Sequence, residues 1–337
     1  MLNPSSARYC SRKFMLLATI LSIATATVAQ TRDYTRIVVF GDSLSDTGNV
    51  AHLSEAKYGL RIPGPVADYT DGRLTDGYDT VPAAQKYFGM WIEQLAQSIP
   101  SRPKVKNSLD GGTDYAYAFA FTGNGTTELT FGPGDSLSVD VKDIGEQVTD
   151  YLATHPKINN STLFVVWGGA NDLINAKSPS DIVNAAVQET IDVQRLIEAG
   201  ATQILVLNLP PLGLTPRLNG SPDASATGTG AAMLFNSWLG TGLSVLHDFY
   251  PGRHVRIFQV DVFSLFMRIA ADPAAYSFTN ISATSQGNYT VDPDTYLFWD
   301  DIHPTTRGHN LLAEAAIKAL SVPQCDSRDM PSCAAAK

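Results

Sequence analysis

Short apolar runs recur along the chain with segments of helical spacing between them. The runs lie at residues 37–40, 115–121, 163–167, 204–207 and 255–260 and are rich in β-branched and aromatic residues, a composition typical of strands. Each run is almost continuously apolar, whereas a strand with one solvent-exposed face alternates apolar and polar residues. The pattern therefore predicts parallel strands that are buried on both faces.

Helical spacing of apolar residues fills the intervals between these runs. Residues 144–152 carry apolar side chains four positions apart, residues 187–196 form a longer helix that ends at Gly200, and residues 311–320 form a last helix. Strands that alternate with helices predict a doubly wound α/β sheet. Residues 219–230 are rich in Gly, Ser and Thr, which predicts a solvated loop within the same domain.

Residues 1–29 have the layout of a secretory signal peptide. Three basic residues precede an apolar run at residues 14–23, and small residues follow at 24–29. A membrane anchor is the alternative, but the run is shorter than the roughly 20 apolar residues that span a bilayer. We expect cleavage near Ala29, a single domain over residues 30–337 without a membrane span, and a secreted protein, extracellular or periplasmic.

Acidic residues outnumber basic ones, with 33 Asp and Glu against 24 Lys and Arg and a formal net charge of −9. This balance disfavours binding to nucleic acid or anionic lipid by charge alone. Signal cleavage would remove Cys10 and leave Cys325 and Cys333, which form a small disulfide loop or remain as two free thiols. No Cys-x-x-Cys pair and no His-Glu-x-x-His pattern occurs, so the sequence implies no metal, and it implies no organic cofactor.

A serine follows the first predicted strand directly. Ligands of open parallel sheets bind outside the carboxyl ends of the strands, and Gly-Asp-Ser at residues 41–43 would present the Ser43 hydroxyl there. The alternative is an ordinary turn in which Asp42 or Ser43 caps the next helix. The pentapeptide Gly-Asp-Ser-Leu-Ser of residues 41–45 recurs at residues 134–138, where no predicted strand precedes it. We therefore interpret Ser136 as a loop or capping serine.

Two further polar segments carry candidate chemistry. After the third predicted strand, Gly168 and Gly169 permit close approach of the backbone to a ligand, and the Asn171 amide can donate to an oxyanion. A glycine-rich turn with Asn171 as a helix cap is the alternative. Near the end of the chain, Asp300 precedes His303 by three residues, so in a turn its carboxylate can meet the imidazole Nδ1–H and leave Nε2 as a base.

These segments resemble, in their order, the sequence blocks of the GDSL (SGNH) hydrolases. The family's Phe-Gly-Asp-Ser-Leu-Ser-Asp-Thr-Gly-Asn block stands at residues 40–49, Gly-x-Asn-Asp at 169–172 and Asp-x-x-His at 300–303. The resemblance extends over nearly the whole chain after the signal segment, with further matching stretches at residues 71–73, 91–96, 208–213 and 296–299.

The resemblance implies a three-layer α/β/α sandwich of the flavodoxin-like type with about five parallel strands. It implies an acyl-ester hydrolase with Ser43 as nucleophile, His303 as general acid and base, Asp300 as the acid that orients the histidine, and Asn171 as an oxyanion donor. The expected substrates are small-molecule, lipid or acylated-carbohydrate esters.

One block departs from the family pattern. Relatives have Asn-Tyr-Ala-x-Gly-Gly-Ala where residues 114–120 read Asp-Tyr-Ala-Tyr-Ala-Phe-Ala. A backbone N–H of the glycine pair donates to the oxyanion in the family, and Phe119, in preference to Ala118, retains such a donor. The phenylalanine would crowd the pocket or demand a different backbone conformation, so the alternative function is a catalytically weakened binding protein for carbohydrate or lipid. A nucleotide-binding protein is disfavoured because no Walker-type loop occurs.

Overall fold

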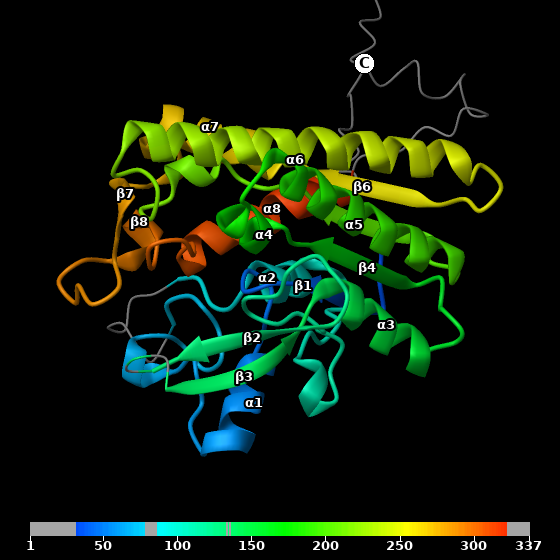
Figure 1. Ribbon diagram of the computed structural model, residues 1–337, viewed down its shortest axis with the longest axis horizontal. Coiled ribbons are helices and arrows are strands. Elements are labelled where there is room, and N and C mark those ends of the chain that lie inside the picture. Colours follow the sequence, from blue (N-terminus) through cyan, green and yellow to red (C-terminus); the bar gives the residue numbers. More distant parts are fainter. Residues whose placement is uncertain (1–31, 78–85, 133, 135, 322–337) are drawn as a thin grey trace, which may run out of the picture.

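The computed structural model describes residues 32–77, 86–132, 134 and 136–321. The predicted signal segment and the two C-terminal cysteines lie outside the described residues. The central sheet has four parallel strands in the order β1-β4-β5-β6 (Figure 1). Their bounds are β1 (Arg36–Gly41), β4 (Thr162–Trp167), β5 (Gln203–Leu207) and β6 (Arg256–Val260).

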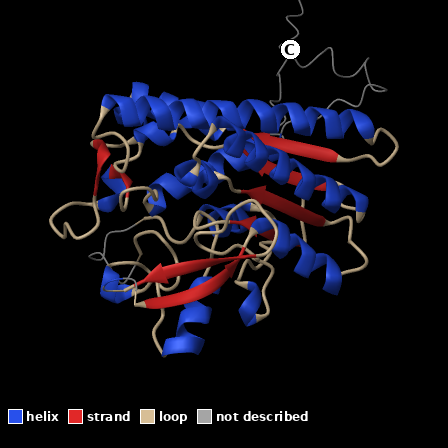
Figure 2. Cartoon of the chain, in the orientation of Figure 1, coloured by secondary structure: helices blue, strands red, loops and turns tan. Residues whose placement is uncertain are grey.

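Helices cover both faces of this sheet (Figure 2). Side chains alternate along each strand, so in β1 Val38 and Phe40 enter one hydrophobic core and Ile37 and Val39 enter the other. The three-layer α/β/α fold is confirmed. One layer contains α3 (Ile144–Thr154), α5 (Pro179–Glu198) and α6 (Pro222–Phe249), and the opposite layer contains α2 (Trp91–Ser98), α7 (Val262–Ala271) and α8 (Thr306–Ser321).

Within the described ranges, no helix is both long and apolar enough to cross a membrane.

Smaller elements surround the carboxyl edge of the sheet. The remaining elements are α1 (Asn49–Tyr58), α4 (Ala170–Asn175), the antiparallel pair β2 (Thr126–Phe131) and β3 (Leu137–Lys142), the pair β7 (Asn280–Thr284) and β8 (Tyr296–Phe298), and short 3-10 turns at Pro65–Ala67, Ser108–Asp110, Leu212–Leu214, Pro273–Tyr276 and Pro293–Thr295.

The strand predicted over residues 115–121 is only partly present. The N–H groups of Tyr115 and Tyr117 donate to carbonyls of β1 at 2.8 and 3.2 Å, so this segment runs along the free edge of the sheet. Beyond Tyr117 the chain turns away, because Phe119 has a φ of +71°, which an extended strand does not allow. The prediction of a regular fifth strand to residue 121 is therefore wrong.

The loop predicted over residues 219–230 is also wrong, because α6 begins at Pro222. The Ser221 side chain accepts a hydrogen bond from the N–H of Ala224, and proline occupies the first helical turn, two signals that start helices despite a Gly- and Ser-rich composition. Gly228 then faces Leu218, where an added Cβ would lie 2.6 Å from a methyl carbon. The small residues thus let α6 pack closely against the turn before it.

Candidate active site

Three of the sequence-predicted residues meet at the carboxyl edge of the sheet. Ser43 follows β1, and Asp300 and His303 follow β8. The Ser43 Oγ lies 2.9 Å from His303 Nε2, and His303 Nδ1 lies 2.7 Å from Asp300 Oδ2. An ionised carboxylate only accepts hydrogen bonds, so the imidazole proton resides on Nδ1 and Nε2 is left as an acceptor for the serine hydroxyl.

The Asp300 carboxylate is held by its own turn. Its Oδ1 accepts hydrogen bonds from the N–H groups of Ile302 and His303 at 2.8 and 2.7 Å. Burial opposes ionisation of Asp300, but the adjacent His303 and these two N–H groups outweigh it and lower the pKa to about 2. The carboxylate therefore stays ionised at any pH at which the imidazole is a base.

The neighbouring carboxylate points elsewhere. Asp301 forms a two-point ion pair with Arg217, with N–O distances of 2.9 and 3.0 Å, and about half of its side chain is exposed. Of the two adjacent aspartates, only Asp300 contacts His303. The three-residue spacing in the sequence predicted this choice.

A tight turn presents Ser43. A Cβ on Gly41 would lie 2.6 Å from the carbonyl oxygen of Trp167, so only glycine fits where β1 ends beside β4. Asp42 is buried, which raises its pKa to about 6, and its Oδ1 accepts the N–H of Leu44 at 3.0 Å. The turn is thus closed from inside and leaves Ser43 at the cavity.

Neither Asp42 nor Ser43 caps the next helix. The Oδ1 of Asp46 accepts the N–H groups of Gly48 and Asn49 at 2.8 and 2.6 Å, at the start of α1. The capping interpretation of the Gly-Asp-Ser turn is therefore wrong. The second serine, Ser136, is exposed in the connection from β2 to β3 and is not among the described residues that line the cavity.

Asn171 lies in the first turn of α4 and lines the same cavity as Ser43. Its Nδ2 donates to the carbonyl of Ala120 at 2.9 Å, which fixes the orientation of the amide and leaves its second hydrogen for another acceptor. The residue at the N-cap of α4 is Gly169, so the interpretation of Asn171 as a helix cap is wrong.

The two glycines before Asn171 serve packing of the surrounding helices. An added Cβ on Gly168 would lie 2.1 Å from the Ile144 side chain, and one on Gly169 would lie 2.6 Å from the Phe235 ring. Gly169 also has a φ of +101°, a backbone conformation that residues other than glycine rarely adopt. Contacts with protein, instead of the expected approach of a ligand, thus account for these glycines.

Phe119 has a backbone conformation that favours glycine. Its φ of +71° is left-handed, which costs a residue with a Cβ about 1–2 kcal/mol. The N–H of Ala118 donates to Asp46 at 2.9 Å, whereas within the described part of the chain the N–H of Phe119 has no hydrogen-bond partner. Strained backbone with a free donor is typical of functional sites.

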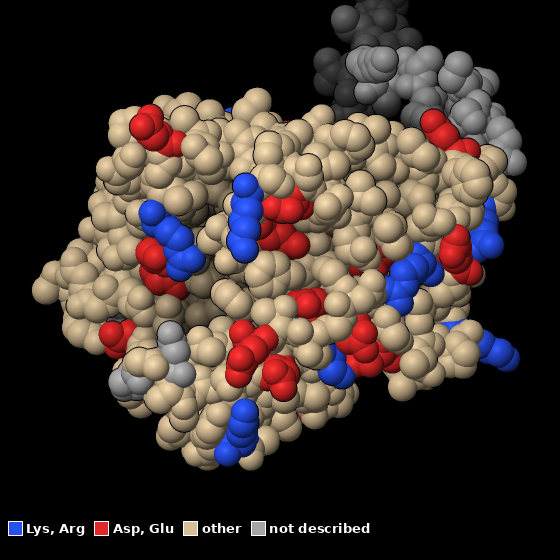
Figure 3. Space-filling model, in the orientation of Figure 1, with Lys and Arg blue, Asp and Glu red and all other residues tan. Residues whose placement is uncertain are grey.

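An apolar cavity of about 300 Å³ adjoins Ser43, His303 and Asn171. The ring of Phe119 forms part of its wall and packs edge-to-face on Phe121, with ring centroids 5.7 Å apart. On the face in Figure 3, acidic and basic side chains are interspersed. Apolar side chains from α1, the segment after it, β2 and α4 also line the cavity, among them Val50, Ile62, Leu74, Leu129, Phe131 and Ile174.

Sequence reasoning missed one residue that contacts the site. The hydroxyl of Tyr69 donates to Asp300 Oδ2 at 2.7 Å across 231 positions of the chain. Tyr69 lies in a loop without periodicity, and the only nearby signal was the matching stretch at residues 71–73. No local pattern connects this tyrosine with the aspartate.

Comparison with known proteins places the chain in a family. The family model for GDSL-like lipase/acylhydrolase matches residues 37–316. The chain is 23% identical to a phosphatidylcholine-sterol acyltransferase of Aeromonas hydrophila, over 90% of this chain and 95% of the relative. It is 25% identical to a GDSL esterase/lipase of Arabidopsis thaliana, over 81% of this chain and 83% of the relative.

A solved structure of a lipolytic G-D-S-L family protein from Veillonella parvula overlaps with 84% of this chain and 96% of its own, at 10% identity and a TM-score of 0.43. The family assignment rests on the family model, which spans most of the chain and includes every segment of the site described above. The chain belongs to the GDSL-like lipase/acylhydrolase family and is a carboxylic ester hydrolase.

Proposed function

We propose that the protein cleaves acyl esters through a covalent acyl-enzyme on Ser43. His303 Nε2 takes the hydroxyl proton as Ser43 Oγ attacks the ester carbonyl, and it returns the proton to the departing alcohol. Water, deprotonated by the same nitrogen, then attacks the acyl carbon. The bond from that carbon to Ser43 Oγ breaks, the acid leaves, and the proton returns from His303 Nε2 to Ser43 Oγ. The observation that carries this proposal is the continuous Ser43–His303–Asp300 hydrogen-bond series, with steps of 2.9 and 2.7 Å.

Three donors are proposed to bind the oxyanion: the N–H groups of Ser43 and Phe119 and the side chain of Asn171. Within the described residues, neither N–H has a partner, and the Asn171 amide is anchored through Ala120. Donors fixed before the reaction stabilise developing charge without reorganisation. The unusual phenylalanine therefore supplies a backbone group and leaves the donor set complete.

The proposed substrate has an apolar acyl group that enters the cavity, on a small-molecule, lipid or acylated-carbohydrate alcohol. Labelling with a fluorophosphonate probe tests the proposal, because only an activated serine reacts. A binding protein weakened by the Phe119 replacement would remain unlabelled. A chain-length series of p-nitrophenyl esters, measured beside acetylated xylan, then identifies the substrate class.

We also infer that the protein is exported, with residues 1–29 as a signal peptide. The basic, apolar and small-residue regions follow one another in the order that signal peptidases require. N-terminal sequencing of the protein recovered outside the cytoplasm should begin directly after Ala29. A chain recovered there with residues 1–29 intact would contradict the inference.

Asn171→Ala should lower kcat by about 10²–10³ with little change in KM, the scale for loss of one oxyanion donor. The reason is that the amide would bind the oxyanion more strongly than the ground-state carbonyl oxygen. Steady-state kinetics on p-nitrophenyl butyrate measure the effect, with circular dichroism as a check of folding. A rise in KM with kcat unchanged would show that Asn171 binds substrate and transition state equally.

Phe119→Gly should preserve hydrolysis of acetate esters and raise hydrolysis of longer acyl chains. The N–H donor remains, the left-handed backbone suits glycine, and removal of the ring enlarges the cavity. The p-nitrophenyl series from acetate to decanoate measures the shift. Loss of acetate hydrolysis in a folded variant would mean that the ring itself is needed, and the account of this block would be wrong.

A further inference from the structure

We propose that Tyr69 is a positioning residue for the proposed reaction, and that its hydroxyl sets the geometry and charge of the Asp300 carboxylate that faces His303. Asp300 Oδ2 accepts two hydrogen bonds of 2.7 Å, one from His303 Nδ1 and one from the Tyr69 hydroxyl. The inference rests on the proposed roles of Ser43 and His303 and adds a fourth side chain to them.

Tyr69 completes the set of donors around the carboxylate. The two backbone N–H groups of the turn occupy Oδ1, and Tyr69 and His303 share Oδ2. Every donor except Tyr69 lies within three residues of Asp300. A buried carboxylate held on both oxygens cannot rotate away from the imidazole. Tyr69 supplies the hydrogen bond to Oδ2 that comes from outside the turn.

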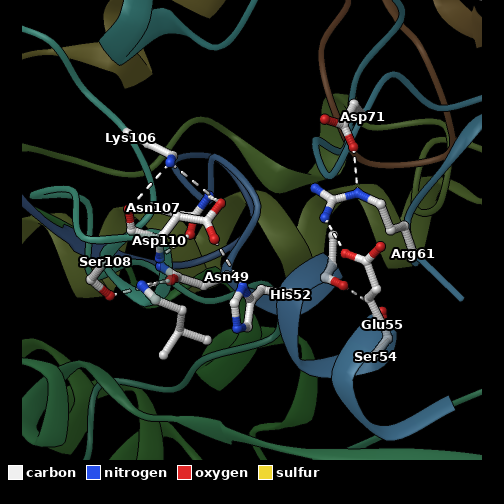
Figure 4. A network of polar contacts seen from close by, with 12 residues as sticks. Asn49, His52, Ser54, Glu55, Arg61, Asp71, Lys106, Asn107, Ser108 and Asp110 are labelled. Atoms are coloured by element: carbon white, nitrogen blue, oxygen red, sulfur yellow. Dashed lines mark hydrogen bonds and ion pairs between the residues drawn. The ribbon is translucent and has the colours of Figure 1, made fainter. Parts of the chain in front are cut away.

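The loop that carries Tyr69 is anchored at both ends. Figure 4 shows the Arg61 guanidinium between Glu55 of α1 and Asp71 of the loop, each at 2.6 Å. Arg61 precedes Tyr69 in the chain. After Tyr69, Arg73 binds both carboxylate oxygens of Glu93 in α2, which is the strong two-point geometry for an arginine and a carboxylate. The anchors keep the phenol at a defined place beside Asp300.

The Tyr69 hydroxyl remains a donor throughout the working range. Burial and the adjacent Asp300 carboxylate both raise the pKa of Tyr69 above its ordinary value. A permanent O–H donor on Oδ2 withdraws charge from the oxygen that also faces His303. The carboxylate therefore stabilises the imidazolium form of His303 less than it would without the Tyr69 hydrogen bond.

Tyr69→Phe should lower kcat and kcat/KM about tenfold with KM unchanged, because Asp300 Oδ2 loses its donor from outside the turn and the carboxylate can rotate away from the imidazole. Tenfold is the scale for loss of one hydrogen bond to a charged group. The acid limb of the pH profile of kcat/KM should move up by roughly half a pH unit, because the carboxylate then stabilises protonated His303 more strongly. The variant does not alter the other titratable groups around Asp300 and His303, which are Asp42, Asp301, Arg217 and His309.

Tyr289→Phe is the matched control. Tyr289 donates to Asp68 at 2.6 Å, so the variant removes a phenol–carboxylate hydrogen bond next to Tyr69 without touching Asp300. Its acid limb should not move. The same shift in Tyr289→Phe would overturn the proposal, and so would a change confined to KM in Tyr69→Phe, because the hydroxyl would then act only through the loop or the cavity wall.

Two further measurements keep the test independent of turnover and folding yield. The low-field proton resonance of His303 Nδ1–H should shift in Tyr69→Phe and not in Tyr289→Phe, whether or not esters are hydrolysed. In an Asp300→Asn background, Tyr69→Phe should cost less than twofold, since the two residues act as one unit. Full additivity would overturn the inference, whereas turnover by Ser43→Ala would instead overturn the proposed function.

Discussion

Ser43→Ala should abolish ester hydrolysis and fluorophosphonate labelling, with kcat reduced on the order of 10⁶-fold, the scale for loss of a serine nucleophile that acts together with its histidine. The physical reason is that, among the described residues, Ser43 Oγ, at 2.9 Å, is the only oxygen within hydrogen-bond distance of His303 Nε2. Hydrolysis of p-nitrophenyl acetate and gel fluorescence of the labelled protein measure the two effects.

Ser136→Ala provides the internal control, because Ser136 belongs to the same five-letter sequence and lies exposed before β3. This variant should retain nearly full activity and labelling. If Ser136→Ala lost its label while Ser43→Ala kept it, the assignment of the nucleophile would be reversed.

Asp300→Asn should slow turnover by about 10⁴-fold, since an amide in place of the carboxylate favours the wrong tautomer of His303 and cannot stabilise the imidazolium. His303→Ala should cost still more, because it removes the base itself. The measurement is kcat and kcat/KM across the pH range for each variant. Asp300 is ionised down to a pKa of about 2, so its own titration should not produce the acid limb of the wild-type profile.

Asp301→Asn is the matched control for this series. Asp301 differs from Asp300 by one position and pairs with Arg217 at the surface, so its loss should change kcat less than threefold. An exposed ion pair of this kind contributes little to stability. Equal effects of the two substitutions would contradict the argument from the spacing of Asp300 and His303.

Local sequence determined the parts of the site in which the interacting residues are near one another. Asp300 and His303 are three residues apart, and Ser43 follows directly on a buried strand, so strand pattern and turn chemistry made them candidates. The resemblance to the GDSL hydrolases then assigned their roles. The same local rules predicted the four sheet strands, because continuous apolar runs have few other stable environments.

The two wrong elements have different causes. Residues 219–230 have a loop-like composition, but the Ser221 and Pro222 start signals and the close packing of Gly228 make the segment helical. The run at residues 115–121 is apolar enough for a strand, yet Phe119 leaves the sheet to hold a left-handed backbone. In the first segment specific start signals outweighed composition, and in the second the conformation of a single residue outweighed the strand propensity of its neighbours.

Sequence by itself determined the family, the α/β architecture and the identity of the candidate serine, histidine and aspartate, since these follow from patterns within short stretches of chain. Only the tertiary structure decided which distant groups meet. Ser43 and His303 are 260 positions apart, and Tyr69 and Asp300 are 231 apart. Hydrogen bonds at such separations depend on how the sheet and its loops pack, and neither periodicity nor composition encodes that packing.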